Sequence, residues 1–554
     1  MLDEKQVEKT ISEEGLTEVV NKTTLPWQQV VLALLLAWLL FVALTPQIVH
    51  WLNPVTGDEP FYLMTATSII NDHDLDETNN YDQHDYWKFS PSCKEIMQPG
   101  WASSNYEPGI PAPGIQPCEP PFDQLAIDLP PHFSKGIIQP GNYTKHGIGL
   151  SFLIVPAFAL GGRVAVVIFM GGLAALLGVN ILLLAWETTG RIRVAWLVWG
   201  TLVFTAPLIT YAFLIFPAIP AALCIIYPFR RIRLATQGGR NNSLQALATG
   251  ACIGFLPWLH SLYLSVSGPL FAYWLLGGRN AIPAIWGWLR QPRRFPPLHL
   301  LPPGWRGVDI LLFFAPLLIF GGLFLSYYQH FYGTYLPNEQ DHAGFVGWNE
   351  IGVGALGLFF DQKWGLLVYA PVYLFGLSGL ALLFSRVTDD KQTRQRRSDF
   401  FWLMAIIIPY FGFIARYAQW WGEWCPPARY LAPILPLLAL PMALLLERLK
   451  GWFGRLLYGF LALWSFAISF TWMLDPKLLY HWQDDQPAKI LTFLKDKADW
   501  LHSVNLAGYI PSFVTNLAPN KGGDYLLIYI IWPAAFLTAG IALVWLSWRN
   551  SKNP

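Results

Sequence analysis

The sequence predicts an all-α polytopic membrane protein. Of its 554 residues, 54% are hydrophobic and only 13% are charged, and the mean hydropathy is +0.36. Soluble domains carry roughly 25% charged residues, about twice that share. Nearly uncharged runs, such as 30–44, 164–186 and 309–325, suit helices surrounded by lipid. Because the basic residues are spread over many short loops, the net charge of +1 gives no indication of nucleic-acid binding.

The first 25 residues are predicted to be a polar cytoplasmic tail. They hold three lysines against six acidic residues, whereas a signal peptide has a basic start and a small-residue cleavage site. We therefore expect the first apolar segment to remain in the protein as a membrane anchor.

About twelve transmembrane helices are expected. Their predicted positions are 27–50, 164–186, 195–214, 216–229, 244–258, 261–276, 308–328, 364–384, 400–418, 430–447, 455–473 and 525–547. The apolar stretch 147–161 contains Pro156 and ends at Gly161-Gly162-Arg163, so it is too short to cross a hydrocarbon core about 30 Å thick. We expect it to lie at the membrane interface or to dip into the bilayer.

Charge sets the predicted topology. Arginine and lysine cluster in alternate loops, and short basic loops stay in the cytoplasm. Both termini of this plasma-membrane protein are then cytoplasmic, although the acidic tail runs against the rule. The extracytoplasmic segments are 51–163, 329–363, 419–429 and 474–524.

Three larger units follow from this topology. A transmembrane domain spans 26–473, with a large first extracytoplasmic loop at 51–163 that contains juxtamembrane helices. A small extracytoplasmic insertion at 474–524 includes a predicted amphipathic helix over 488–504, and 525–554 form the last span and a cytoplasmic end.

An acidic pair follows the first span. Asp58 and Glu59 lie where the chain leaves the bilayer, and ionisable groups at that depth indicate a functional site. Two adjacent carboxylates would disfavour double ionisation and raise at least one pKa, as a general base requires. The alternative is that Asp58 caps a membrane-surface helix predicted over 61–71.

The loop after this pair is rich in acids and amides. Asp74, Asn80 and Tyr81 are candidate substrate-binding residues, because such side chains hydrogen-bond a polyhydroxylated molecule. Asp72, Asp74 and Asp76 alternate as in a calcium loop, but the turn glycine and distal glutamate of an EF-hand are missing. The alternative is a solvated acidic turn. No metal site is predicted, and casual binding of a divalent cation is left open.

Three cations are predicted at one depth on the outer face. Lys145, Lys363 and Arg429 could each hold a phosphate, Arg429 in a bidentate manner. Basic residues at span ends are also ordinary snorkelling anchors, and Glu423 could be the ion-pair partner of Arg429.

Candidate groups for binding a ring-shaped substrate, such as a sugar, lie near these cations in the sequence. His146, Trp421 and Trp424 are predicted substrate-binding residues, the tryptophans as a stacking platform, although aromatic belts are common in membrane proteins. Cys93 and Cys118 share the first outer loop, where either a disulfide or two free thiols would fit.

These features resemble the GT-C glycosyltransferases, integral membrane enzymes that include protein O-mannosyltransferases, lipid A aminoarabinose transferases and mycobacterial arabinofuranosyltransferases. The resemblance covers roughly residues 26–450, and its later blocks look like those of bacterial proteins assigned to this superfamily. It rests on the blocks GDEPFYLMTATSIINDHDLDETNNY, KHGIGLSFLIVPAFALGGR, YAFLIFPAIPAAL, GFLPWLH, FDQKWGLLVYAPVY and WGEWCPPARYLAPILP.

The resemblance implies transfer of a sugar from a polyprenyl-phosphate donor to a lipid, glycan or protein acceptor, with inversion. It implies that Asp58 is the base, that Glu59 is a second acid and that Lys145 binds the donor phosphate. Related enzymes often have two prolines after that lysine, where this chain has His146-Gly147. No cofactor is implied with certainty.

Two other functions are open. A secondary transporter would also have about twelve spans, but carriers bury charge near the bilayer midplane in broken helices, and few acids or bases occur inside these spans. A lipid-linked polysaccharide polymerase or ligase would rely on arginines in late outer loops.

Overall fold

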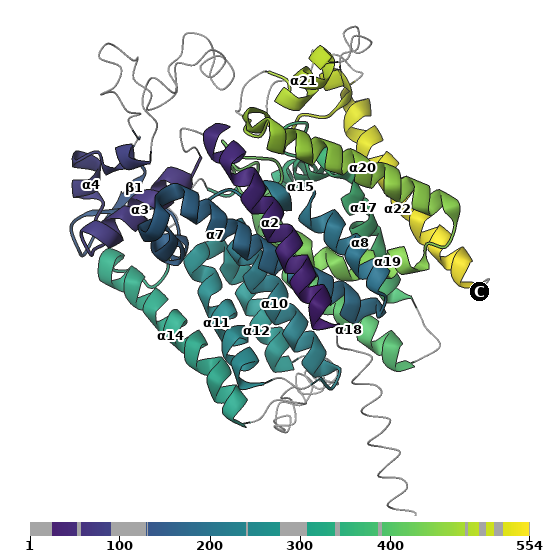
Figure 1. Ribbon diagram of the computed structural model, residues 1–554, viewed down its shortest axis with the longest axis horizontal. Helices are drawn as coiled ribbons and strands as arrows, with labels where there is room; N and C mark the ends of the chain where they lie inside the picture. The colour runs from purple at the N-terminus through teal and green to yellow at the C-terminus, as the bar shows by residue number, and fades with distance from the viewer. Residues whose placement is uncertain are drawn as a thin grey trace, which may run out of the picture.

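The computed structural model describes residues 25–51, 57–89, 129, 131–239, 242–276, 307–337, 344–385, 390–481, 486–497, 506–514 and 525–552. Within these ranges the chain is a bundle of helices with a single short β-hairpin (Figure 1). Its long apolar helices make it an all-helical membrane protein, as predicted. The predicted tail up to residue 24 and both Cys93 and Cys118 lie outside the described residues.

Six helices of the described chain are long and apolar enough to cross a bilayer. They are α2 (Trp27–Trp51), α7 (Gly149–Thr189), α14 (Gly307–Tyr332), α18 (Asp390–Arg416), α20 (Trp452–Leu474) and α22 (Tyr525–Lys552). All six contain runs of apolar residues with almost no charge in the middle, which is what hydrocarbon requires of a spanning helix. Helix length thus accounts for six of the twelve predicted spans.

The other predicted spans are shorter or interrupted helices. Pro207, Pro371 and Pro436 interrupt three of them, because proline lacks the N–H that continues a helix. The α-helices in these regions are α8 (Ile192–Val203), α9 (Leu208–Tyr211), α10 (Ala218–Thr236), α11 (Ser243–Leu259), α12 (Leu264–Leu276), α16 (Leu366–Tyr369), α17 (Leu374–Gly379) and α19 (Ala439–Arg448). Helix α15 (Ile351–Phe360) lies in the predicted outer segment 329–363. The 3₁₀ turns are η1 (Asp85–Lys88), η2 (Ser261–Tyr263), η5 (Trp348–Glu350), η6 (Pro371–Tyr373), η7 (Leu380–Phe384), η8 (Leu435–Leu438), η9 (Pro476–Leu478) and η11 (Leu506–Tyr509).

Helix α7 is divided by two glycines. Its 41 residues would extend about 60 Å, twice the thickness of a hydrocarbon core. The backbone leaves helical geometry at Gly161 and at Gly162, where φ is 59° and ψ is −152°, a conformation that favours glycine. The predicted separation of the 147–161 stretch from the following span is therefore present as a break in the helix.

Close helix packing holds one side of the bundle together. A Cβ added at Gly250 would lie 2.0 Å from the carbonyl oxygen of Phe313, and one at Gly254 would lie 3.1 Å from Cα of Leu317. These two glycines, four residues apart, let α11 lie directly along α14. The indole ring of Trp274 then stacks on Phe313 at 3.9 Å between ring centres.

The first long loop forms a small structured unit. It contains α3 (Glu59–Asn71), α4 (Thr78–Asp82) and the antiparallel hairpin of β1 (Phe133–Lys135) and β2 (Asn142–Thr144). The predicted helix over 61–71 is confirmed as α3 and begins two residues earlier. We expected it to lie on the membrane with one apolar face. Instead residues 59–68 are all buried, because α3 packs against α7, where the Ser151 hydroxyl donates to the Tyr62 carbonyl.

The described parts of several predicted basic loops meet at one end of the bundle. Three ion pairs join them there, Arg191 with Glu447, Arg230 with Glu187 and Arg233 with Asp399. Helix α10 begins two residues after Phe216, and Arg233 lies in its last turn. The length of this helix therefore separates the end with the ion pairs from the end that contains Phe216.

The predicted outer segments meet at the other end. The loop that follows α18 contacts the segment after η9 through a β-bridge between Cys425 and His481. The predicted amphipathic helix over 488–504 appears as α21 (Lys489–Lys497), and residues 498–505 lie outside the described ranges.

Candidate functional site

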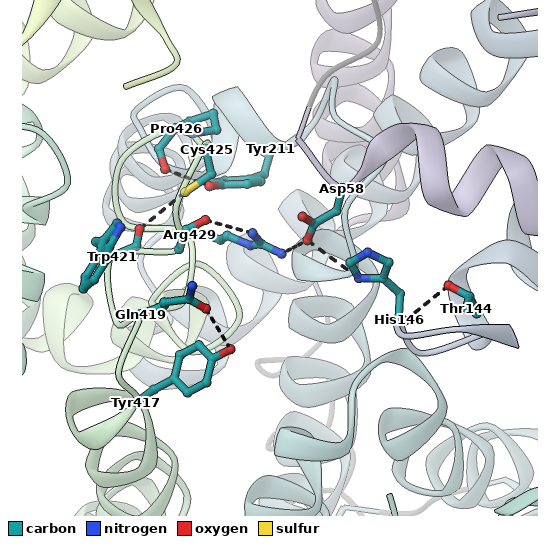
Figure 2. A network of polar contacts seen from close by, with 11 residues as sticks. Asp58, Thr144, His146, Tyr211, Tyr417, Gln419, Trp421, Cys425, Pro426 and Arg429 are labelled. Carbon is teal, nitrogen blue, oxygen red and sulfur yellow. Dashed lines mark hydrogen bonds and ion pairs between the residues drawn. The ribbon is translucent and has the colours of Figure 1, made fainter. Parts of the chain in front are cut away.

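Asp58 lies between an arginine and a histidine that come from distant parts of the chain. Its Oδ2 atom pairs with Arg429 Nη2, and the same oxygen lies 3.9 Å from His146 Nδ1 (Figure 2). Arg429 and Asp58 are 371 residues apart in sequence. The Asp58 side chain is 21% exposed and that of Arg429 is 13% exposed, so solvent or a ligand can reach the pair.

Gly57 brings Asp58 against the late loop. Its φ is +65°, and a Cβ at this position would lie 3.0 Å from the Trp424 carbonyl oxygen and 3.1 Å from the Phe216 ring. Only glycine combines this left-handed backbone with so close an approach. Asp58 is the N-cap residue of α3, but its side chain makes no capping hydrogen bond. The carboxylate is turned to Arg429 instead of to the helix.

Arg429 is held by its own loop and by aromatic rings. Its Nη1 donates to the Gly422 carbonyl at 3.1 Å, and its guanidinium carbon lies 4.7 Å from the centre of the Phe216 ring. The alternative partner, Glu423, accepts a hydrogen bond from Gln419 instead. Arginine stacked on a ring is a common arrangement for binding planar or tetrahedral anions.

His146 belongs to a stack of rings on the opposite side of Asp58. Its ring lies 5.5 Å from that of Phe61 and 4.9 Å from that of His132, both nearly parallel to it. The backbone N–H of His146 donates to the Thr144 hydroxyl at 3.2 Å, which fixes the chain as it leaves β2 (Figure 2). A second histidine therefore lies in the surroundings of the candidate base.

Opposing effects act on the pKa of Asp58. Burial alone would raise it, but the attraction of Arg429, and then of His146, outweighs burial and holds the pKa below its usual range. Asp58 is thus an ionised acceptor at neutral pH. Its proton affinity depends on how much of the Arg429 charge it receives.

Glu59 belongs to a different network. It is fully buried, and its Oε1 accepts a hydrogen bond from the Ile215 N–H at 2.8 Å. Burial raises its pKa to about 6, opposed by Arg163 and by the Ile215 hydrogen bond. The expectation that one of the two adjacent acids has a raised pKa is met at Glu59. The main cause is burial, and repulsion from Asp58 contributes less.

The other predicted phosphate ligands lie at different distances from this centre. Lys145 is half-buried and directly precedes His146, and it forms no ion pair within the described ranges. Lys363 is 2% exposed and lies in a turn closed by Asp361, whose Oδ1 accepts from the N–H groups of Lys363 and Trp364. Its Nζ lies 5.7 Å from the Trp364 ring centre. Of these two lysines, Lys145 is the one next in sequence to a residue of the Asp58 centre, His146.

Asp74, Asn80 and Tyr81 hold the first loop in shape. The Ser68 hydroxyl donates to Asp74 Oδ1 at 2.9 Å. The buried amide of Asn80 donates to Asp72 at 2.7 Å and to Asp85 at 2.8 Å. The Tyr81 hydroxyl accepts from the His132 N–H at 3.4 Å. These side chains are engaged within the loop, and none has a described contact with Asp58 or Arg429.

The predicted tryptophans flank the late loop. Trp421 lies 6.4 Å from Trp364 between ring centres, and Trp424 packs against Tyr480 at 5.6 Å, with Lys489 Nζ 5.3 Å above the Trp424 ring. Trp421 precedes Gly422, the acceptor for Arg429, so one tryptophan adjoins the centre directly. Over the described part of the chain, no group of three His, Cys, Asp or Glu is placed to hold a metal ion.

Four residues of this region were not found by sequence reasoning. They are Phe216, His132, Tyr480 and His481, which contact the centre or its surrounding rings. The block that contains Phe216 was part of the resemblance, but no role followed from it. For the other three no sequence signal existed, because their partners are distant in the chain.

No protein-family model, curated protein or solved structure matches this chain.

Proposed function

We propose that this protein is a membrane glycosyltransferase of the GT-C type. It transfers a sugar from a polyprenyl-phosphate donor to a hydroxyl of a lipid, glycan or protein acceptor on the extracytoplasmic face, with inversion. The protein crosses the plasma membrane about twelve times, in part through interrupted helices, and both of its termini lie in the cytoplasm.

The observation that carries the proposal is the partly exposed pair of Asp58 and Arg429. Transfer from a lipid phosphate needs a base near the acceptor hydroxyl and a cation for the departing phosphate. It needs no strong general acid, because a phosphate is already a good leaving group. The pair supplies both requirements within one contact, and half-buried Lys145 adds a second cation next to His146.

The bond changes assign one role to each group. The acceptor oxygen forms a bond with the anomeric carbon as the bond from that carbon to the phosphate oxygen breaks. The electron pair leaves with the phosphate, held by Arg429, with Lys145 beside it. The hydroxyl proton passes to Asp58, whose Oδ1 is not engaged by any described residue.

Donor binding prepares the base in this mechanism. A phosphate that takes up the charge of Arg429 weakens the attraction that keeps the pKa of Asp58 low. Burial then raises the pKa, and the carboxylate accepts a proton more readily. Asp58 is therefore a weak base in the free protein and a stronger one beside bound donor.

The transporter alternative has less support. Carriers place buried charge near the bilayer midplane. Here the buried pair of Arg233 and Asp399 joins the last turn of α10 to a residue just before the apolar part of α18. That position suits a structural link between helix ends.

Binding of a radiolabelled polyprenyl-phosphate sugar to the purified protein in nanodiscs tests the proposal. We expect Arg429→Gln to lose donor binding at least roughly 10-fold, because one charge-assisted contact is worth about 1.5–3 kcal/mol. The matched control is Arg416→Gln. Arg416 lies at the same end, also against an aromatic ring, and donates to the Val346 carbonyl without an acidic partner in the described chain. Equal donor affinity in the Arg429 variant, the control and the wild type would refute the phosphate role.

A further inference from the structure

A group of buried polar atoms beside the candidate centre has no hydrogen-bond partner. Within the described residues these atoms are the side-chain oxygen and nitrogen of Gln362, both ring nitrogens of His481, and the indole N–H groups of Trp364 and Trp421. Gln362 is fully buried and His481 is 2% exposed. Buried polar groups are nearly always paired, since leaving them unpaired costs stability, so such a group calls for an explanation.

The four residues come together from three segments of the chain. The ring of Trp364 lies 6.4 Å from Trp421 and 6.4 Å from His481. The ring of Tyr369 lies 6.5 Å from His481, and its hydroxyl donates to the Gln362 carbonyl. The rings of Trp364, Trp421 and His481 therefore lie close together, and Gln362 is two residues from Trp364 in the same turn.

Backbone contacts hold this region in place. The Gln362 N–H donates to the Pro511 carbonyl at 2.8 Å, and Asp361 accepts from the N–H groups of Trp364 at 3.1 Å and of Phe513 at 2.6 Å. The bridge between Cys425 and His481 fixes the third segment. The side chains are thus oriented by their backbone before any ligand is bound, which lowers the entropic cost of binding.

The side chains that carry these unpaired atoms are uncharged. Burial, and then the neighbouring charges of Lys489 and Lys363, hold the pKa of His481 well below its usual value, so the ring is neutral. The Leu479 carbonyl favours protonation, but neither ring nitrogen has a hydrogen bond of normal geometry. A neutral imidazole and an amide each offer a donor and an acceptor, and the indoles offer donors.

Hydroxyl groups match this set best, because each one donates and accepts. The two indole rings add apolar faces of the kind that pack against the C–H face of a sugar ring. An anion would instead meet the acceptor atoms of Gln362 and His481. The nearby lysines have contacts of their own: Lys489 donates to the Lys477 carbonyl at 3.2 Å, and Lys363 lies over Trp364.

We propose that Gln362, Trp364, Trp421 and His481 form the subsite for the sugar ring of a substrate. This inference rests on the proposed function. The subsite adjoins the centre, since Trp421 precedes the Gly422 carbonyl that accepts from Arg429, and the Ala428 N–H donates to the Trp364 carbonyl at 3.0 Å. The phosphate is held at Arg429 and the hydroxyl-bearing ring at these four side chains.

The test combines stability with binding of two separate probes to the full-length protein in nanodiscs. One probe is a panel of methyl glycosides of common hexoses and pentoses, and the other is a sugar-free polyprenyl phosphate. We expect at least one methyl glycoside to bind the wild type. Gln362→Met removes the unpaired amide at similar volume, so we expect an unchanged or higher Tm together with roughly 3- to 10-fold weaker glycoside binding.

Two further variants complete the design. Trp421→Phe keeps an aromatic face and removes the indole N–H, so it also weakens glycoside binding, even if the Gln362 variant fails to fold. Tyr373→Phe removes a buried hydroxyl outside the four-residue group and serves as the control with unchanged binding. Polyprenyl phosphate binds all three variants as it binds the wild type.

The outcomes separate the two proposals. The sugar subsite is overturned if no methyl glycoside binds the wild type. It is also overturned if the Gln362 and Trp421 variants both bind the glycoside as tightly as the wild type does. If the variants have a lower Tm but bind the glycoside normally, these side chains only bind water or pack in the core, and the sugar subsite is again overturned. Loss of the subsite with polyprenyl phosphate still bound through Arg429 leaves the proposed function standing, whereas failure of the phosphate to bind the wild type counts against the proposed function itself.

Discussion

Two arginine–aspartate pairs occupy opposite ends of this molecule, and they differ in how completely they are enclosed. Arg233 Nε donates to both oxygens of Asp399 at 3.1 Å, Gln395 adds a bond at 2.8 Å, and the two charged side chains are 5% and 2% exposed. Arg429 meets only Oδ2 of Asp58, and these side chains are 13% and 21% exposed.

The difference separates a structural pair from one that is available for chemistry. The carboxylate of Asp399 is fully used by partners within the protein, so a ligand gains nothing there. At the other end Asp58 keeps one oxygen free of described partners, His146 lies 3.9 Å from the other oxygen, and unpaired polar groups lie close by. An open pair gives up some stability and retains the capacity to exchange partners.

The largest expected effect is on activity at the open pair. Asp58→Asn removes the proposed base with little change in shape, so we expect transfer from a polyprenyl-phosphate sugar to fall roughly 10²- to 10⁴-fold. The rate is measured with purified protein in nanodiscs under single-turnover conditions, so that binding and chemistry are separated.

Asp399→Asn is the matched control, because it makes the same atomic change at the enclosed pair. We expect it to keep the wild-type rate per folded molecule. If the two variants have equal rates, the contrast between the ends carries no catalytic meaning.

The free energy of unfolding should show the opposite order, with the larger loss at the enclosed pair. Arg233→Gln leaves a buried carboxylate without its charge partner, which typically costs about 3–5 kcal/mol. Arg429→Gln leaves Asp58 with partial solvent contact and a neighbouring histidine, and we expect a loss of about 1–2 kcal/mol.

Thermal unfolding of the two variants in the same detergent checks this ranking. A larger loss for the Arg429 variant would mean that the open pair is mainly a structural link.

Gly57 tests how the open pair is positioned. Gly57→Ala places a side chain in a left-handed backbone region, at a cost of about 1–2 kcal/mol, and also drives Cβ against Trp424 and Phe216. Gly190→Ala has nearly the same φ, +64°, but its Cβ meets no atom within 4 Å. We expect both variants to lose stability and only the Gly57 variant to lose transfer activity as well. Equal activity in the two would show that the Gly57 contact does not position Asp58.

A buried acid at the open end should give a smaller, pH-dependent effect. Glu77 is 1% exposed, no basic side chain of the described chain contacts it, and burial raises its pKa from 4.5 to about 8. The folded protein therefore holds a proton that the unfolded chain releases. This contribution to stability is complete below pH 4.5 and is lost as the pH rises through about 8, at no more than about 1.4 kcal/mol per pH unit.

Glu77→Gln should flatten this dependence, because the amide does not titrate. Chemical unfolding of the wild type and the variant is compared at pH 5, 6.5 and 8. A slope shared by both proteins would assign the dependence to other groups.

Particular residues show how far the sequence alone could predict the site. Asp58, Arg429 and His146 were each identified from local features. These were an acidic pair after a span, a loop rich in proline and tryptophan, and the position next to Lys145. Their mutual contact was not predictable. The same reasoning proposed Asn80 as a substrate ligand, whereas the fold uses its amide to join Asp72 and Asp85.

The sequence by itself determined that this is a helical membrane protein, where its apolar segments lie along the chain, and which loops share charge. These properties depend on hydrophobicity and charge summed over neighbouring residues, which are local quantities. Only the tertiary structure decided which carboxylate meets which cation, that α3 is enclosed, and that Gln362 and His481 are left unpaired beside the centre. Those outcomes depend on contacts between residues as much as 371 positions apart, which packing sets and no local pattern encodes.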